Sequence, residues 1–174
     1  MPSAADKNYF ELFGLPVTFD LDLGGLSTRY RELARETHPD RFAGGSDFER
    51  RLAMQMVTLV NEAFRVLKSP VSRASYLLEL KGARSAHAAA VDPAFLVEQM
   101  ELRERLESLR EQRDGLAALT RDVRELLSER EQSLRVSLSA THWLPERALR
   151  TVQEMQYLEK LRQQIADLED DIQQ

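Results

Sequence analysis

The chain has 174 residues, with 24 lysines and arginines against 29 aspartates and glutamates and a formal net charge of −5. It contains no cysteine, which excludes a disulfide framework, a thiolate metal site and a cysteine nucleophile. The basic residues are interleaved with acids rather than massed in one stretch. Nucleic acid is therefore not expected as a partner.

The first residues, MPSAADKNYFELFGLP, have neither the apolar run of a signal peptide nor the arginine-rich amphipathic stretch typical of mitochondrial targeting. No segment approaches the roughly 20 apolar residues that a membrane-spanning helix requires. We therefore expect a soluble, cytoplasmic protein that has no membrane partner.

Apolar residues recur at spacings of three and four along most of the chain, whereas the signals of β-hairpins are nearly absent. The pattern predicts an all-α fold. Four helices are expected in the first half, over residues 6–13, 23–37, 46–68 and 71–81. Three antiparallel helices are expected in the second half, over residues 93–112, 115–140 and 144–172, with breaks near Asp114–Gly115 and Thr141–Pro145.

The composition changes at Gly82, where the stretch GARSAHAAAVDP has almost no large apolar residue. This stretch ends with Asp92 and Pro93, a pair typical of a helix N-cap followed by the first helical position. Two helical domains are therefore predicted, divided near residue 82, and the second is a three-helix bundle. Their ranges are 1–81 and 93–174, with a linker over 82–92.

The triplet His38-Pro39-Asp40 interrupts the helical pattern between the second and third expected helices. An imidazole beside a carboxylate can act as a general acid or base, but no nucleophile motif, phosphate loop or nearby second histidine accompanies it. His87 and His142 stand alone. Alternatively, the triplet ends one helix and caps the next, because proline cannot continue a helix. On three residues alone, helix termination is the favoured interpretation.

The surroundings of the triplet change this interpretation. A short opening helix, a helix with a basic outer face, the triplet and a longer amphipathic helix follow one another, and this order resembles the J-domain of DnaJ-type co-chaperones. The resemblance implies that His38, Pro39 and Asp40 form an exposed loop. In J-domains that loop docks on the ATPase domain of a DnaK-class chaperone and stimulates ATP hydrolysis.

Arginines on the second helix extend this possible docking surface. Arg31 and Arg35 lie far from the apolar stripe on a helical wheel, so they are expected to face solvent. Such a pair alone is equally consistent with a solubilising face. Together with the triplet and Arg41 after it, the pair favours electrostatic docking onto an acidic chaperone surface. Glu32 departs from the pattern, because many J-domains have another basic residue there.

The helix expected over residues 93–112 carries two apolar stripes, although a bundle helix needs only one. The first stripe, sufficient for a core face, comprises Phe95, Leu102, Leu106 and Leu109. The second lies about 100–200° round the helix and comprises Leu96, Val97 and Met100. Either both stripes are buried, or the second is an exposed patch rimmed by Glu101 and Glu104, as in a protein-docking site. The residues alone leave both interpretations open.

A J-domain followed by a leucine-rich helical domain resembles the HscB family, the dedicated co-chaperones of iron–sulfur cluster assembly, over essentially the whole chain. The matching stretches are YFELFGLP at 9–16, HPDRF at 38–42, RASYLLEL at 73–80, AFLVEQMELRE at 94–104 and YLEKLR at 157–162. The resemblance implies HscA as the DnaK-class partner and the iron–sulfur scaffold IscU as the bound protein. The implied scaffold contacts are Leu96, Val97, Met100, Glu101, Glu104 and Tyr157.

Three positions depart from the family pattern: Val97 replaces a methionine, Tyr157 a phenylalanine and Ser108 an acid, so the affinity for the scaffold is expected to differ. The missing cysteine-based metal module of some eukaryotic relatives implies a bacterial-type protein without bound metal. A monomer without cofactor is expected. Two alternatives remain. One is a J-domain co-chaperone for another client, or one that dimerises through its bundle, and the other is a small helical enzyme using His38 and Asp40.

Overall fold

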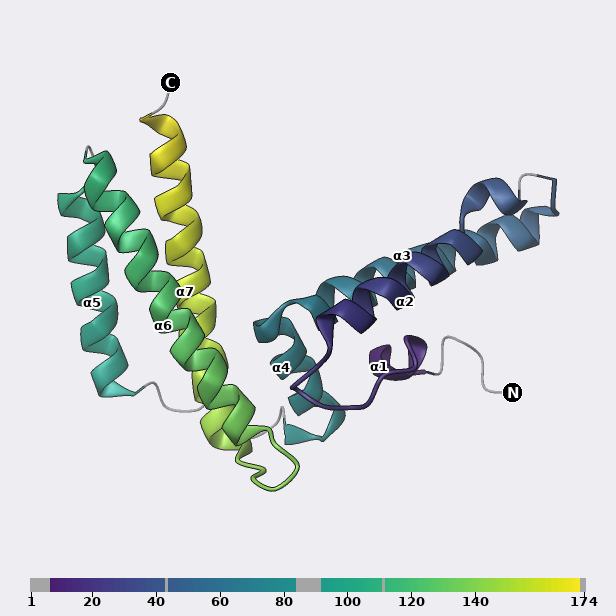
Figure 1. The fold of residues 1–174 in the computed structure, drawn as a ribbon, viewed down its shortest axis with the longest axis horizontal. Helices are drawn as coiled ribbons and strands as arrows, with labels where there is room; N and C mark the ends of the chain where they lie inside the picture. Colours follow the sequence, from purple (N-terminus) through teal and green to yellow (C-terminus); the bar gives the residue numbers. More distant parts are fainter. Residues whose placement is uncertain (1–6, 43, 84–91, 111, 173–174) are drawn as a thin grey trace. The chain divides into compact units, whose positions relative to one another are not determined.

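The computed structural model describes residues 7–42, 44–83, 92–110 and 112–172, and Figure 1 shows its helices. Among these residues there is no β-strand, only one isolated bridge between Leu138 and Trp143. The prediction of an all-α fold is confirmed. The chain forms two compact units, residues 1–77 and 78–174.

The first unit is built from helices of very different length. They are α1 (Tyr9–Leu12), α2 (Leu23–Glu36), the 3₁₀ helix η2 (Pro39–Phe42), α3 (Asp47–Lys68) and α4 (Pro70–Leu80), whose last residues belong to the second unit. The first helix begins later than the predicted residue 6, because Asn8 caps it: the Asn8 side chain accepts a hydrogen bond from the Glu11 amide at 3.0 Å. Residues 1–6 lie outside the described residues.

Aromatic and aliphatic side chains fill the core of the first unit. Its buried members are Phe10, Phe13, Phe19, Leu26, Ala53, Val60, Ala63, Leu67, Val71, Ala74 and Leu77. The packing of α2 along α3 is fixed by Tyr30, whose ring stacks on Phe64 with centroids 4.1 Å apart and whose hydroxyl hydrogen-bonds Asn61 at 3.0 Å. Each large apolar side chain buried in this way contributes roughly 1.5–3 kcal/mol. The packed α2–α3 pair therefore holds the turn between these two helices in place.

The second unit is a bundle of three helices, α5 (Pro93–Ser108), α6 (Arg113–Ser137) and α7 (Pro145–Asp171). The most extensive contact is between α6 and α7, which lie side by side in Figure 1. Leucine, valine and isoleucine side chains from all three helices form its core. The core cluster comprises Leu102, Leu106, Leu116, Leu119, Val123, Leu158, Leu161 and Ile165. The predicted three-helix bundle is confirmed.

Two glycines act in different ways at helix ends. Gly82 has a φ of 72° and follows the end of α4, as predicted for a C-cap residue. Gly115 was expected to mark a break, but it lies inside α6. A side chain there would place its Cβ 2.5 Å from Cδ2 of Leu109, so glycine lets that leucine pack against the helix. The predicted break between the two helices is present, but it lies a few residues before Asp114–Gly115, between Ser108 and Arg113.

The division between the units falls within α4, after Leu77, and not near residue 82 as the change in composition predicts. Most of the predicted linker, residues 84–91, lies outside the described residues. The assignment of residues 1–81, 82–92 and 93–174 to a J-domain, a linker and a scaffold-binding bundle therefore stays a prediction.

Candidate functional sites

The His38-Pro39-Asp40 turn begins where α2 is forced to stop. Thr37 closes the helix: its amide and its hydroxyl both donate to the carbonyl oxygen of Leu33, at 2.9 and 2.8 Å. Pro39 has no N–H and disfavours helical backbone at the residue before it. The helix therefore cannot pass through His38, and the chain turns into η2 instead.

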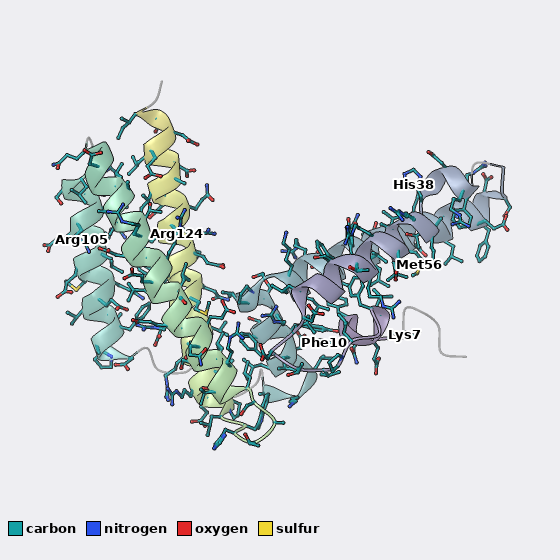
Figure 2. The ribbon with its side chains drawn as sticks, in the orientation of Figure 1. Lys7, Phe10, His38, Met56, Arg105 and Arg124 are labelled. Atoms are coloured by element: carbon teal, nitrogen blue, oxygen red, sulfur yellow. The ribbon has the colours of Figure 1, made fainter. Side chains whose placement is uncertain are left out.

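The polar side chains of this turn face solvent, at one end of the α2–α3 pair (Figure 2). The side chains are 58% exposed for His38 and 90% for Asp40. His38 Nδ1 lies 3.3 Å from the Asp40 amide, which donates to it, and 3.5 Å from the Asp40 carboxylate. Among the described residues neither side chain has another polar partner, and Ser46 rather than Asp40 caps α3. The turn therefore presents both polar side chains at the surface.

The predicted basic residues beside the turn are exposed. Arg31 donates hydrogen bonds only to groups one turn earlier on its own helix, at 3.2 and 3.3 Å. The side chains of Arg35 and Arg41 make no hydrogen bond or ion pair with any described residue, although the Arg41 amide donates to the His38 carbonyl oxygen at 3.0 Å. Glu32, the acidic departure from the J-domain pattern, pairs with Arg29 at 3.0 Å. Its charge is offset by that pair, so the three predicted arginines remain available to a partner.

The structure resolves the question of the two stripes on α5. The first stripe is buried: Phe95, Leu102 and Leu106 are each about one-twentieth exposed (5%, 5% and 6%). The second stripe, which we call the α5 strip, consists of Leu96, Val97 and Met100. These side chains are 46%, 55% and 71% exposed. The interpretation in which both stripes are buried is therefore wrong, and the α5 strip is an apolar surface.

Charged and aromatic residues border the α5 strip. Glu101 and Glu104 are exposed on the same helix. Tyr157 reaches α5 from α7, packing edge-on against Phe95 with ring centroids 5.8 Å apart. Its hydroxyl donates a 3.0 Å hydrogen bond to the carbonyl oxygen of Gln99. Tyr157 thus fastens the strip-bearing helix to the bundle and is only half-buried itself.

This position of Tyr157 predicts a loss of bundle stability in alkaline solution. Burial raises the Tyr157 pKa above its ordinary value of 10.0, with Arg103 opposing the effect. Because the Tyr157 pKa is raised in the folded state, the contribution of the neutral hydroxyl to the stability of the bundle is fully present below pH 10. This contribution is lost as the pH rises through the folded-state pKa. Melting the protein between pH 9 and 12 should show this loss. Tyr157→Phe, which cannot ionise, should melt less steeply with pH than the wild type, and identical pH dependence would contradict the prediction.

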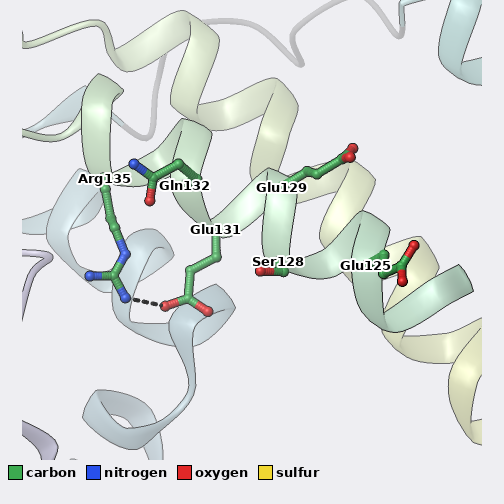
Figure 3. A pocket seen from close by; sticks show the side chains of 6 residues that line it. All are labelled: Glu125, Ser128, Glu129, Glu131, Gln132 and Arg135. Atoms are coloured by element: carbon green, nitrogen blue, oxygen red, sulfur yellow. Dashed lines mark hydrogen bonds and ion pairs between the residues drawn. The ribbon is translucent and has the colours of Figure 1, made fainter. Parts of the chain in front are cut away.

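One hollow of about 560 Å³ lies on the surface of α6. Figure 3 shows that all its lining residues come from this one helix, with Glu131 paired to Arg135 at 2.8 Å and Glu125 pointing away. A single helix offers no opposite wall, so the hollow cannot enclose a substrate. It brings together none of the residues singled out from the sequence.

In the described ranges, no group of three or more histidine, aspartate or glutamate side chains is arranged to hold a metal ion. No described helix has an apolar stretch long enough to cross a membrane. The residues singled out from the sequence thus lie on two exposed surfaces, one at the turn and one on α5.

Comparison with known proteins gives consistent matches along the chain. Residues 91–166 match the family model described as the HscB C-terminal oligomerisation domain. The chain is 40% identical over 168 residues to the co-chaperone protein HscB homolog of Aliivibrio fischeri strain MJ11, covering 94% of this chain and 97% of that protein. The structure of chaperone HscB from Vibrio cholerae is 37% identical, with a TM-score of 0.82 and coverage of 95% and 99%. Human co-chaperone HscB is 28% identical, with a TM-score of 0.86 and coverage of 95% and 83%.

A helical unit that displays a His-Pro-Asp turn, followed by a three-helix bundle, defines the class of J-domain co-chaperones with an added bundle. The chain belongs to the HscB family, the J-domain co-chaperones of iron–sulfur cluster assembly. The resemblance seen in the sequence is thereby confirmed at the level of the family. The roles of individual residues at the turn and on α5 stay predictions.

Proposed function

We propose that this protein holds the scaffold protein IscU on the α5 strip and presents the His-Pro-Asp turn to HscA, a DnaK-class chaperone, in the cytoplasm. The turn and its arginines stimulate the chaperone's ATPase. Neither surface carries out chemistry itself, so the protein acts as a regulator of its partner's activity. The chaperone and the scaffold are thus the two partners of a single adaptor.

The exposure of the α5 strip is the observation that supports binding of the scaffold protein to it. Leu96, Val97 and Met100 leave roughly half or more of their surface in water. Three adjacent exposed apolar side chains on one helix are uncommon on a surface that has no partner. The neighbouring carboxylates of Glu101 and Glu104 would steer a basic region of the scaffold toward the strip and limit binding of unsuitable proteins.

Joining two binding surfaces in one chain has a physical consequence. A scaffold held on the bundle is presented to the chaperone at an effective concentration set by the length of the connection, in the millimolar range for short tethers. The chaperone then meets its client and its activator together. ATP turnover should therefore respond to both proteins more strongly than to either one.

This cooperation is the test of the proposal. The steady-state ATPase rate of HscA is measured alone, with IscU, with this protein, and with both. We expect the rate with both to exceed the sum of the two separate increments. A rate that this protein raises equally with and without IscU would reject the adaptor function. No increase under any condition would also reject the chaperone half.

A second candidate is self-association through the bundle, which the description of the matching family model as an oligomerisation domain favours. In that case a second copy of the chain, rather than IscU, would cover the α5 strip. Sedimentation equilibrium separates the two possibilities. We expect a monomer for the purified protein. A dimer that Met100→Asp converts to monomer would favour self-association instead, and capture of a different client from cytosol would favour another J-domain function.

A further inference from the structure

One charged residue occupies a core position of the bundle. Buried residues recur along α6 at spacings of three and four, and they include Leu116, Leu119, Val123 and Leu134. Arg130 falls in the same register, four residues before Leu134. Its side chain is only 22% exposed. A guanidinium in such a place must be paired, because burying an unpaired charge is costly.

The partners of Arg130 come from both other helices. Its Nη2 lies 2.8 Å from Oε2 of Glu98 on α5, and its Nε lies 2.6 Å from Oε2 of Glu154 on α7. The carboxylate side chains are 27% and 16% exposed. A third acid, Glu129, is 3.8 Å away and largely exposed. Arg130 therefore links all three helices through its ion pairs with Glu98 and Glu154, which are poorly exposed to water.

The link to Glu98 matters because Glu98 follows Val97 directly and lies between the members of the α5 strip. Two other polar contacts hold α5 to the bundle: Tyr157 to the Gln99 carbonyl, and Arg105 to Asp122 at 2.7 Å. The Arg105 pair is roughly half exposed on each side, so it should contribute little. Of the two ion pairs that reach α5 in the described structure, the one made by Arg130 is the better shielded.

We propose that Arg130 is a positioning residue for scaffold binding: it fixes α5 in the place at which the strip fits its partner. This inference rests on the proposed scaffold function of the strip. Glu98 and Glu154 both accept from the same guanidinium, so without it two half-desolvated carboxylates face one another. Their repulsion displaces α5, the helix with the least extensive packing in the bundle. The α5 strip then has the same residues, but they no longer lie where they fit the partner.

The test compares Arg130→Met with Arg105→Met. Both variants remove one positive charge and one ion pair between α5 and α6, and Arg130→Met also removes the pair with Glu154 on α7. Binding to purified IscU is measured by titration calorimetry, and hydrogen exchange reports the amides of α5. We expect Arg130→Met to weaken binding about tenfold and to speed exchange in α5, because removing one partner of a shielded pair leaves the others uncompensated. Arg105→Met should change neither quantity.

Two further variants separate positioning from simple destabilisation. Adding Glu98→Gln to Arg130→Met removes the repulsion, and part of the affinity should return even though a second residue has been changed. Arg130→Lys keeps the charge but reaches fewer carboxylate oxygens than a guanidinium, so it should bind with intermediate affinity. It also gives a folded variant if Arg130→Met unfolds.

The outcomes separate this inference from the function it rests on. Wild-type protein that fails to bind IscU would reject the scaffold function, while exchange in α5 would still test the role of Arg130. Wild-type binding with unchanged affinity and unchanged exchange in Arg130→Met would overturn the inference alone. A double variant that binds no better than Arg130→Met would overturn it as well, because the loss would then not arise from the two carboxylates.

Discussion

Replacing His38 with glutamine is expected to abolish stimulation of the DnaK-class chaperone while leaving the protein folded. The His38 side chain is 58% exposed, so its replacement should disturb little of the packing in the first unit. Its contact within the turn is an acceptor for the Asp40 amide at 3.3 Å, and a glutamine oxygen can take over that hydrogen bond. The turn should keep its shape and lose only the ring presented to the partner. Loss of a central interface residue of this kind weakens docking by about 30-fold or more.

The control is His142→Gln, which makes the same chemical change at an exposed histidine of the bundle. Chaperone ATPase rates, the melting temperature and IscU affinity are measured for both variants. We expect His38→Gln to lose stimulation with the other two quantities unchanged, and His142→Gln to match the wild type. If His38→Gln is folded and still stimulates the chaperone, the turn is not the chaperone-binding site.

Periodicity and caps were sufficient to predict the helices and one core face. Phe95, Leu102 and Leu106 repeat with the period of a helix, and all three are buried. The same calculation placed Leu96 and Met100 on a separate face but could not say whether that face was covered. A helical wheel gives the angle between two side chains on one helix and contains no information about neighbouring helices. Exposure of the α5 strip therefore had to come from the structure.

Two residues show where the apolar pattern misleads. Leu52 lies at core spacing on α3, yet it is 50% exposed, and Ala53 is the one buried residue among residues 47–56. Arg130 is the opposite case, a charged residue at a core position of α6. Its place in the leucine register was a usable signal, but its partners on α5 and α7 are 32 and 24 residues away in sequence and had no local signature.

Truncating the α5 strip is expected to weaken IscU binding strongly without affecting the J-domain. Leu96 and Met100 are 46% and 71% exposed, so their apolar surface is free to be buried by a partner. Burying side chains of this size contributes roughly 1.5 kcal/mol each, and losing both corresponds to about a 100-fold loss of affinity. The double variant Leu96→Ala, Met100→Ala should therefore bind IscU about 100-fold more weakly in titration calorimetry. Its stimulation of the chaperone in the absence of IscU should equal that of the wild type.

A second pair of exposed apolar residues supplies the control. Val136 and Leu144 are 46% and 44% exposed elsewhere on the bundle, and changing both to alanine removes a comparable amount of apolar surface. If general hydrophobicity of the bundle attracts the scaffold, both double variants should lose affinity to a similar extent. If the α5 strip is a specific site, only the Leu96→Ala, Met100→Ala variant should lose affinity for IscU. Adding Glu104→Ala should weaken binding further, and this additional loss should shrink at high salt, because screening weakens the attraction between exposed charges. Equal affinity of all variants and wild type would remove the strip from the scaffold interface.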